Sequence, residues 1–63
     1  MYENFKFLTT DLDDENEFVF VDIYVDEKAG QVAVCQVGGY PQDSDSTIYG
    51  GKTAKEILAR FDY

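Results

Sequence analysis

The chain has 63 residues, of which thirteen are acidic, five are basic and none is histidine, so its formal net charge at pH 7 is -8. A chain of this size buries only roughly 60% of the surface that it exposes when unfolded, which predicts one small domain over residues 1–63 without a large enzyme pocket. The acidity argues against direct binding to nucleic acid or to an anionic membrane, because both attract clustered Lys and Arg. A hydrophobic content of 44% argues against an acidic disordered tail, so we expect the chain to fold.

The residue types that are scarce limit the chemistry further. With one cysteine, Cys35, and no histidine, a single chain cannot form a disulfide, assemble the usual zinc ligands, or build a Ser-His-Asp or Cys-His catalytic arrangement. We therefore expect no enzyme activity, no metal and no cofactor. The first residues show no apolar signal-peptide core, and no stretch approaches the ~20 apolar residues that span a bilayer, which predicts a cytoplasmic location and no membrane partner.

The first half of the chain predicts two strands around an acidic loop. Residues 5–10 are typical of a short strand, and residues 11–17 carry five carboxylates that repel one another, which favours a solvated loop. Residues 17–25 form the strongest strand pattern, with β-branched and aromatic residues alternating at period two. One face of that strand is aliphatic and consists of Val19, Val21, Ile23 and Val25. The other face is largely aromatic and consists of Phe18, Phe20, Asp22 and Tyr24.

A hairpin and a long turn-rich loop are predicted next. Residues 26–30 connect to a returning strand over 31–37, with Gly30 placed for the positive φ that closes such hairpins. Cys35 lies among valines in that strand, which indicates a small buried hydrophobe more than a reactive nucleophile. Residues 38–46 form the loop, and residues 47–49 favour a short additional strand.

The C-terminal residues predict a helix. Thr53 and Glu56 have the spacing of a capping box, so we expect Thr53 to cap the helix start. Four apolar residues at helical spacing form one stripe facing the sheet: Ala54, Ile57, Leu58 and Phe61. The prediction is therefore an α+β domain, a small antiparallel sheet of three to four strands with one C-terminal helix packed on one face.

Two ligand motifs are incomplete. Gly50-Gly51-Lys52-Thr53 matches the end of a phosphate-binding P-loop, but Ser46 stands where that pattern requires its first glycine. The acidic run from Asp11 has the composition of an EF-hand loop, but Asn16 and Asp22 replace its glycine and its bidentate glutamate. A turn followed by a capped helix, and a solvated loop, explain these segments better.

The predicted architecture leaves a second sheet face and an uneven charge to account for. One short helix covers one face, so the aromatic face is either covered by the loops or packs against a second copy or a partner. Residues 1–51 carry eleven acids and two bases, a net charge of -9, whereas residues 52–63 carry a net +1. Carboxylates spaced like backbone phosphates would suit a basic groove; the alternative is that they only keep the domain soluble.

A short, acidic α+β chain poor in Cys and His resembles the small inhibitors that phages and mobile elements direct against host nucleic-acid enzymes. That class includes anti-CRISPR proteins, anti-restriction proteins and uracil-DNA glycosylase inhibitors, several of which mimic DNA. Residues 51–57 are similar to a helix start in one phage glycosylase-inhibitor family, although that motif is mostly a capping box and transfers no functional residue. The resemblance implies a phage protein acting in the cytoplasm of its host cell.

The resulting hypothesis is a non-enzymatic inhibitor that covers the basic nucleic-acid-binding surface of a host defence or DNA-processing protein. The acidic residues expected to contact this partner are Asp11, Asp13, Asp14, Glu15, Glu17, Asp22, Asp26 and Glu27. The aromatic contacts are expected from Phe20, Tyr24 and Tyr40. The alternative hypothesis is a homo-oligomeric structural or accessory domain, a homodimer through the aromatic sheet face, in which the acids only solubilise.

Overall fold

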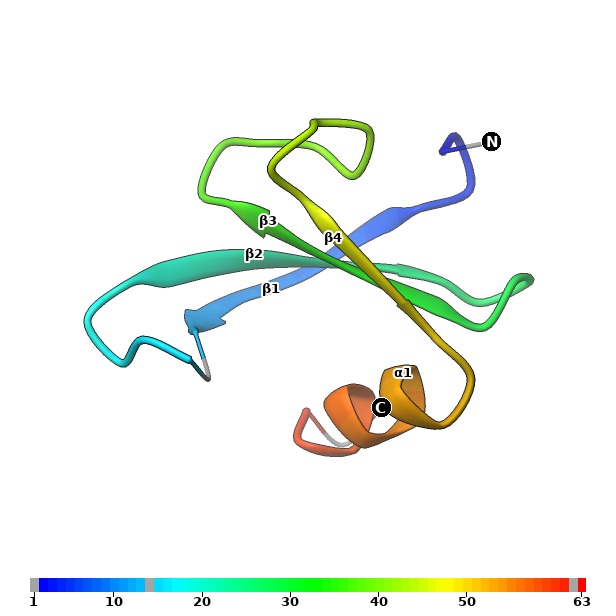
Figure 1. Cartoon of the computed structure of the whole chain (residues 1–63). Helices are drawn as coiled ribbons and strands as arrows, with labels where there is room; N and C mark the ends of the chain where they lie inside the picture. Colours follow the sequence, from blue (N-terminus) through cyan, green and yellow to red (C-terminus); the bar gives the residue numbers. More distant parts are fainter. Residues whose placement is uncertain (1, 14, 62) are drawn as a thin grey trace.

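The computed structural model describes residues 2–13, 15–61 and 63. The predicted fold class is confirmed: four antiparallel strands in the order β1-β2-β3-β4 form one sheet, and a C-terminal helix packs on one of its faces (Figure 1). The elements are β1 (Lys6–Leu12), β2 (Phe20–Asp26), β3 (Gln31–Gln36), β4 (Thr47–Gly50) and α1 (Gly51–Ala59). We call the face under α1 the inner face and the opposite face the outer face.

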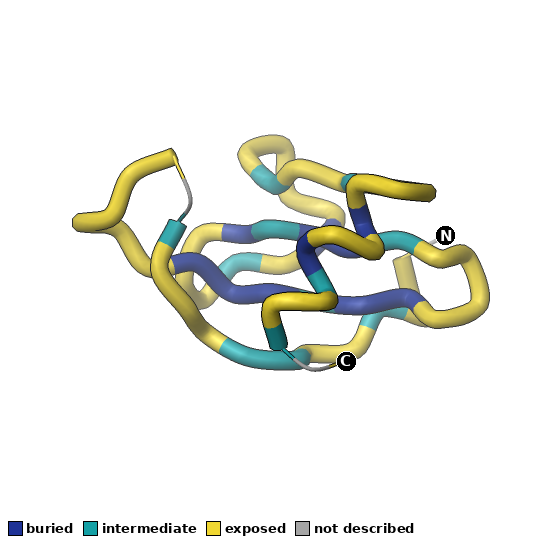
Figure 2. The backbone as a smooth tube through the Cα atoms, turned by 90° about the horizontal axis from the view of Figure 1, so that it is seen from below, coloured by how far each residue is buried: buried dark blue, intermediate teal, exposed yellow. Residues whose placement is uncertain are grey.

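The hydrophobic core lies between α1 and the inner face. The buried cluster joins the two central strands to the helix and consists of Val21, Ile23, Val32, Ala54 and Ile57. Leu58 and Phe61 pack against it partly buried, so the predicted apolar stripe of the helix is confirmed. Figure 2, seen from the helix side, shows the buried positions following the central strands and reaching the helix. This packing is what stabilises so short a helix, because most helical stability in proteins comes from burying one face.

Strand β1 is longer than predicted and carries a bulge. Asp11 pairs with Val21 and Leu12 with Phe20, so the prediction that a loop starts at residue 11 is wrong. An edge position explains the difference, because the backbone of Asp11 pairs while its carboxylate stays exposed. The register shifts between Phe7 and Thr9. Leu8 therefore packs against the core, whereas the Phe7 ring meets that of Tyr24 edge-on, with centroids 5.7 Å apart.

The segment between β1 and β2 is a closed loop, and β2 begins three residues later than the sequence pattern predicts. The amide of Asp13 donates to the carbonyl of Val19 at 2.8 Å, and the amide of Val19 donates to the carbonyl of Asn16 at 3.0 Å. The amide of Phe18 donates to Oδ1 of Asn16 at 3.2 Å. These turn hydrogen bonds use backbone amide donors that a strand would need for hydrogen bonds to its neighbouring strand. Val19, predicted in the aliphatic core face, is consequently exposed.

The helix starts earlier than predicted and has no side-chain cap. It begins at Gly51 with Gly50 as its N-cap residue, so the capping role predicted for Thr53 is wrong. Gly51 adopts a left-handed φ of 56° directly after β4. This conformation, which glycine adopts without steric cost, turns the chain into the helix two residues ahead of Thr53. The predicted positive φ of Gly30 in the β2–β3 hairpin is confirmed, at 64°.

The loop between β3 and β4 folds over the centre of the outer face (Figure 1). We call residues 37–46 the covering loop. Its Pro41 is buried, and beneath it Ala33 and Cys35 are buried as well, which confirms the prediction for Cys35. Of the two possibilities left open for the outer face, cover by a loop is realised at its centre. Phe7 and Phe20 stay exposed, and packing of this face against a second copy or a partner stays a prediction.

Candidate functional site

The topology brings two loops to the same end of the sheet. The register pairs the end of β1 with the start of β2, at Leu12 and Phe20, and the end of β3 with the start of β4, at Val34 and Thr47. The β1–β2 loop and the covering loop therefore leave the sheet at one end, and the β2–β3 hairpin lies at the other (Figure 1). We call the first of these the acidic end.

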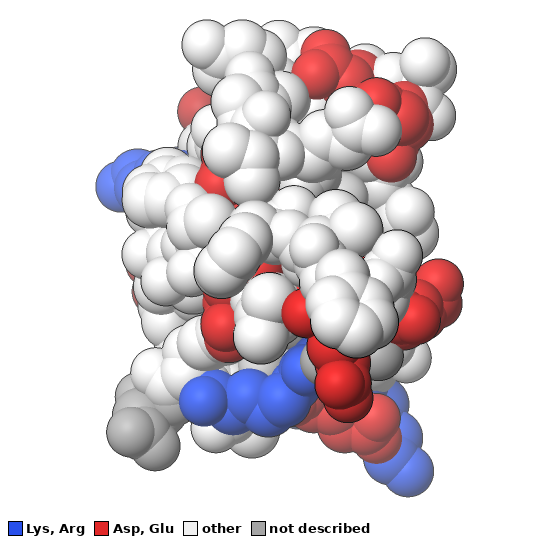
Figure 3. Space-filling model, turned by 90° about the vertical axis from the view of Figure 1, so that its left-hand side faces the viewer, with Lys and Arg blue, Asp and Glu red and all other residues white. Residues whose placement is uncertain are grey.

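Carboxylates concentrate at the acidic end. Six described acids belong to it, in or beside the two loops: Asp11, Asp13, Glu15, Glu17, Asp43 and Asp45. Asp14, a further acid predicted to contact the partner, lies outside the described residues. Lys6 and Lys28 belong to the opposite end of the sheet, at the start of β1 and in the β2–β3 hairpin. Figure 3 looks at the acidic end and shows its carboxylates in several groups separated by uncharged surface, with basic atoms along the lower edge.

The acidic end also exposes much apolar surface. Phe18 is 95% exposed, Phe20 is 57% exposed and Tyr40 is 56% exposed. Three aliphatic side chains there are exposed as well: Leu12, Val19 and Val37. Apolar side chains gathered at one place on a small domain indicate an interaction site more than single exposed residues do.

Two of the predicted contact acids have structural roles instead. Asp22 is only 8% exposed, and its carboxylate accepts hydrogen bonds from Oγ1 of Thr10 at 2.6 Å and from the amide of Gly38 at 2.9 Å. Both bonds stabilise the charged form, so they hold the pKa of Asp22 below its usual range. Asp26 is buried and accepts from the amide of Ala29 at 3.1 Å within the β2–β3 hairpin. Neither carboxylate faces the surface where a partner would meet it.

The remaining predicted contact residues are divided between the two ends. Phe20 and Tyr40 are exposed at the acidic end, whereas Glu27 lies on the β2–β3 hairpin at the opposite end. Tyr24 is half-buried, and its hydroxyl donates to the carbonyl of Gly39 at 3.3 Å, which ties it to the covering loop. Burial is the main cause that raises the pKa of Tyr24, and the nearby charge of Asp22 adds to it.

Sequence reasoning did not include the covering loop's acids, Asp43 and Asp45, or the exposed Phe18 among the contact residues. A signal for the two acids was present in the predicted order of strands. In an antiparallel sheet whose neighbouring strands are consecutive, the first and third connections lie at the same end. Applied to the predicted loops, that rule would have placed residues 43–45 beside residues 11–17.

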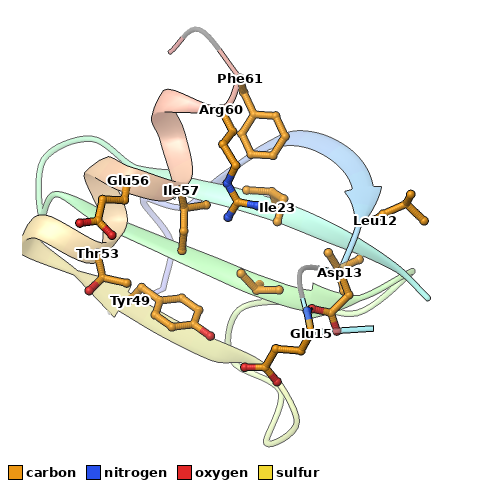
Figure 4. A pocket seen from close by; sticks show the side chains of 12 residues that line it. Leu12, Asp13, Glu15, Ile23, Tyr49, Thr53, Glu56, Ile57, Arg60 and Phe61 are labelled. Carbon is orange, nitrogen blue, oxygen red and sulfur yellow. The ribbon is translucent and has the colours of Figure 1, made fainter. Parts of the chain in front are cut away.

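A groove lies on the inner side of the acidic end, between α1 and the β1–β2 loop. It has a volume of about 480 Å³ and an apolar floor formed by Val21, Ile23, Val34 and Ile57. In Figure 4 the carboxylates of Asp13 and Glu15 lie on one side of this floor and Glu56 on the other. Arg60 reaches over the floor from the end of the helix, beside Phe61.

Neither a cluster of metal-ligating side chains nor a membrane-spanning helix is found among the described residues. Among them no group of three or more Cys, Asp or Glu side chains is arranged to hold a metal ion. No helix in this part of the chain is long and apolar enough to cross a bilayer. Comparison with models of known protein families, with curated proteins and with solved structures finds no match to this chain. The candidate site is therefore defined by its geometry alone, and it is an acidic, partly apolar surface with an adjoining groove.

Proposed function

We propose that this chain is a non-enzymatic inhibitor that docks its acidic end on the basic nucleic-acid-binding surface of a host defence or DNA-processing protein. The observation that carries the proposal is that one end of the sheet gathers six described carboxylates and the most exposed apolar side chains. Duplex DNA is bound chiefly through its phosphates. A surface of opposite sign to the DNA-binding groove competes for the same place.

The two kinds of side chain have different tasks in this interface. Carboxylates on the two loops speed the encounter with a basic surface and fix its orientation, and their effect weakens as salt is added. Apolar and aromatic side chains such as Phe18, Phe20 and Tyr40 supply the desolvated contacts that slow dissociation. Asp22 acts indirectly, because it holds the covering loop in place.

The same observations favour this function over a homodimer. Two acidic ends facing each other would place like charges in contact, which costs several kcal/mol in an interface. The flat aromatic face that a symmetric dimer would use is interrupted by the covering loop, under which Asp22 and Cys35 are buried. A basic partner meets neither obstacle.

The test is capture of a partner followed by competition with DNA. The tagged chain is incubated with bacterial lysate at low and at high salt, and each captured protein is assayed for DNA binding with and without the chain. We expect a nucleic-acid-binding protein that is retained at low salt, released at high salt and displaced from duplex DNA by the chain. Capture of no such protein at low salt, or capture without competition, would contradict the proposal.

Matched variants locate the surface. Glu17→Lys with Asp45→Lys reverses two charges at the acidic end, and Glu3→Lys with Glu27→Lys reverses two at the opposite end, so both double variants change the net charge of -8 equally. We expect the first to abolish capture and the second to retain it. Equal loss in both would show that only net charge matters. Light scattering on the isolated chain tests the rival, because a stable dimer that survives the first double variant would favour homo-oligomerisation.

A further inference from the structure

We propose that the groove between α1 and the β1–β2 loop binds the side chain of an arginine from the partner. This inference rests on the proposed function and identifies the group that the partner contributes. The groove volume of about 480 Å³ lies in the range of sites that hold small ligands. Its lining combines an apolar floor with charged groups at the rim, which is the pattern that a long basic side chain requires.

The floor suits the aliphatic stem of such a side chain. Ile23 from β2 and Ile57 from the helix present methyl groups to the groove (Figure 4), and Val34 from β3 lines it as well. Arginine and lysine bury their stems along apolar surface while the charged head stays at a wet rim. A free anion or a carboxylate would lose hydration against this floor and gain nothing from it.

The rim suits the charged head. Asp13 and Glu15 line the groove on the side of the β1–β2 loop and Glu56 on the side of the helix (Figure 4), and Tyr49 is a further lining residue with a hydroxyl. These three carboxylates outnumber the positive charge of Arg60 in the groove lining. A planar guanidinium with five donors can meet carboxylates on two sides, which an ammonium group does less well.

One guanidinium of the chain itself, that of Arg60, already lies in the groove. Arg60 extends from the end of α1 over the floor, toward Ile23 (Figure 4). An arginine of the partner would therefore compete with Arg60 for part of this space. Removing the Arg60 guanidinium should strengthen binding of an external arginine, because it frees part of the groove and removes a positive charge that repels a basic side chain.

The experiment is a titration of the isolated chain followed by NMR of backbone amides and of Ile and Val methyl groups. Three probes are compared: the end-blocked tripeptide Gly-Arg-Gly, the same peptide with citrulline, which keeps the stem without the charge, and guanidinium chloride, which keeps the charge without the stem. We expect the arginine peptide to shift the methyl signals of Ile23, Val34 and Ile57. It should bind about fivefold more tightly than either other probe, because the citrulline peptide cannot form the ion pairs and guanidinium lacks the stem that packs on the floor.

Variants in one loop provide a matched control. Glu15→Gln removes a rim carboxylate, and Glu17→Gln makes the same charge change in the same loop at a residue outside the groove lining. We expect Glu15→Gln to weaken arginine-peptide binding about threefold, Glu17→Gln to leave it nearly unchanged, and Arg60→Gln to strengthen it.

Equal effects of Glu15→Gln and Glu17→Gln, equal binding of the citrulline peptide, or shifts confined to loop amides would overturn the inference. The two proposals fail separately. Partner capture with no arginine-specific shift in the groove would remove the inference alone, whereas arginine binding without any DNA-competing partner would remove only the inhibitor function.

Discussion

The two faces of the sheet are closed by different physical means. On the inner face, Ile23 and its aliphatic neighbours pack against the helix in a continuous apolar cluster. On the outer face, the covering loop is attached by the hydrogen bond from the Gly38 amide to Asp22 and by that from the Tyr24 hydroxyl to the Gly39 carbonyl, while the Thr10 hydroxyl on β1 donates to the other oxygen of Asp22. Alternate residues of the single strand β2 thus serve both faces.

This difference determines how each face should respond to change. Apolar burial is non-directional and roughly proportional to the area removed from water, so the inner face depends on volume and tolerates changes of pH. Charge-assisted hydrogen bonds are directional and weaken when the carboxylate is protonated. The covering loop should therefore open locally while the core stays folded, and each experiment below tests that contrast.

The largest expected effect is on the inner face. Ile23 is 4% exposed, and Ile23→Ala should lower the free energy of unfolding by about 2–5 kcal/mol because it leaves a cavity in the core. A domain of this size has a total stability of roughly 3–9 kcal/mol, so the variant is expected to be near unfolding. Urea titration followed by circular dichroism measures the change. Ile48→Ala, at an exposed position on the edge strand β4, is the control, and an equal loss there would contradict the assignment of the core.

The next effect is on the outer face. Asp22→Ala removes the acceptor of two hydrogen bonds and should cost about 1–3 kcal/mol. Hydrogen exchange of the Gly38 amide should accelerate by more than that of the helix amides, because the covering loop loses its attachment first. Asp26→Ala, which removes a buried carboxylate from the β2–β3 hairpin, provides the comparison. The idea of a separate loop attachment is wrong if both variants affect Gly38 alike.

A smaller effect should appear as pH falls. The pKa of Asp22 is lowered in the folded state from its ordinary value of 3.8, first by the Thr10 hydroxyl and then by the Gly38 amide. Its stabilising contribution is therefore complete above the unfolded-state pKa and is lost as the pH falls through the lower folded-state value. Unfolding free energies of the wild type and Asp22→Asn should differ at neutral pH and converge in acid. A constant difference down to the lowest pH would show that the carboxylate charge is irrelevant.

The smallest effect on stability is expected at the acidic end itself. Phe18 is 95% exposed, so Phe18→Ser should change the free energy of unfolding by less than about 0.5 kcal/mol. The same change should reduce retention of the partner in the capture experiment, since it removes apolar contact area. Phe7→Ser is the matched aromatic change, and it should cost more stability because the Phe7 ring packs edge-on against Tyr24. Undiminished partner retention by Phe18→Ser would exclude Phe18 from the interface.

The strands and the helix were predictable where one hydrophobic periodicity extended over several residues. The residues at which these elements begin and end were not predictable. The alternation in β2 and the helical stripe from Ala54 to Phe61 identified the strand and the helix. The prediction failed at Asp11, at Phe18 and at Thr53, because each lies where a turn or an edge competes with the local pattern. At these positions backbone hydrogen bonds and the positive φ of Gly51 determine where the strand or helix begins or ends. The hydrophobic pattern specifies neither of them.

The candidate site was predictable to a smaller extent. The acidic run from residue 11 was identified from its composition, and Asp13, Glu15 and Glu17 lie in the β1–β2 loop, within the acidic loop predicted for residues 11–17. The burial of Asp22 was not predictable, because its partners come from residues 12 positions before it and 16 positions after it. Long-range pairs of this kind depend on strand register, which the sequence of one strand does not specify by itself.

The sequence by itself determined the α+β class, the surplus of negative charge and the absence of histidine chemistry, since these follow from periodicity and composition alone. The tertiary structure decided which carboxylates face solvent, which two loops share one end of the sheet, and that a groove opens between that end and the helix. The physical reason is that the solvent exposure of a carboxylate depends on what the chain folds over it. In this molecule that is the covering loop, which turns Asp22 from an expected contact residue into an internal support.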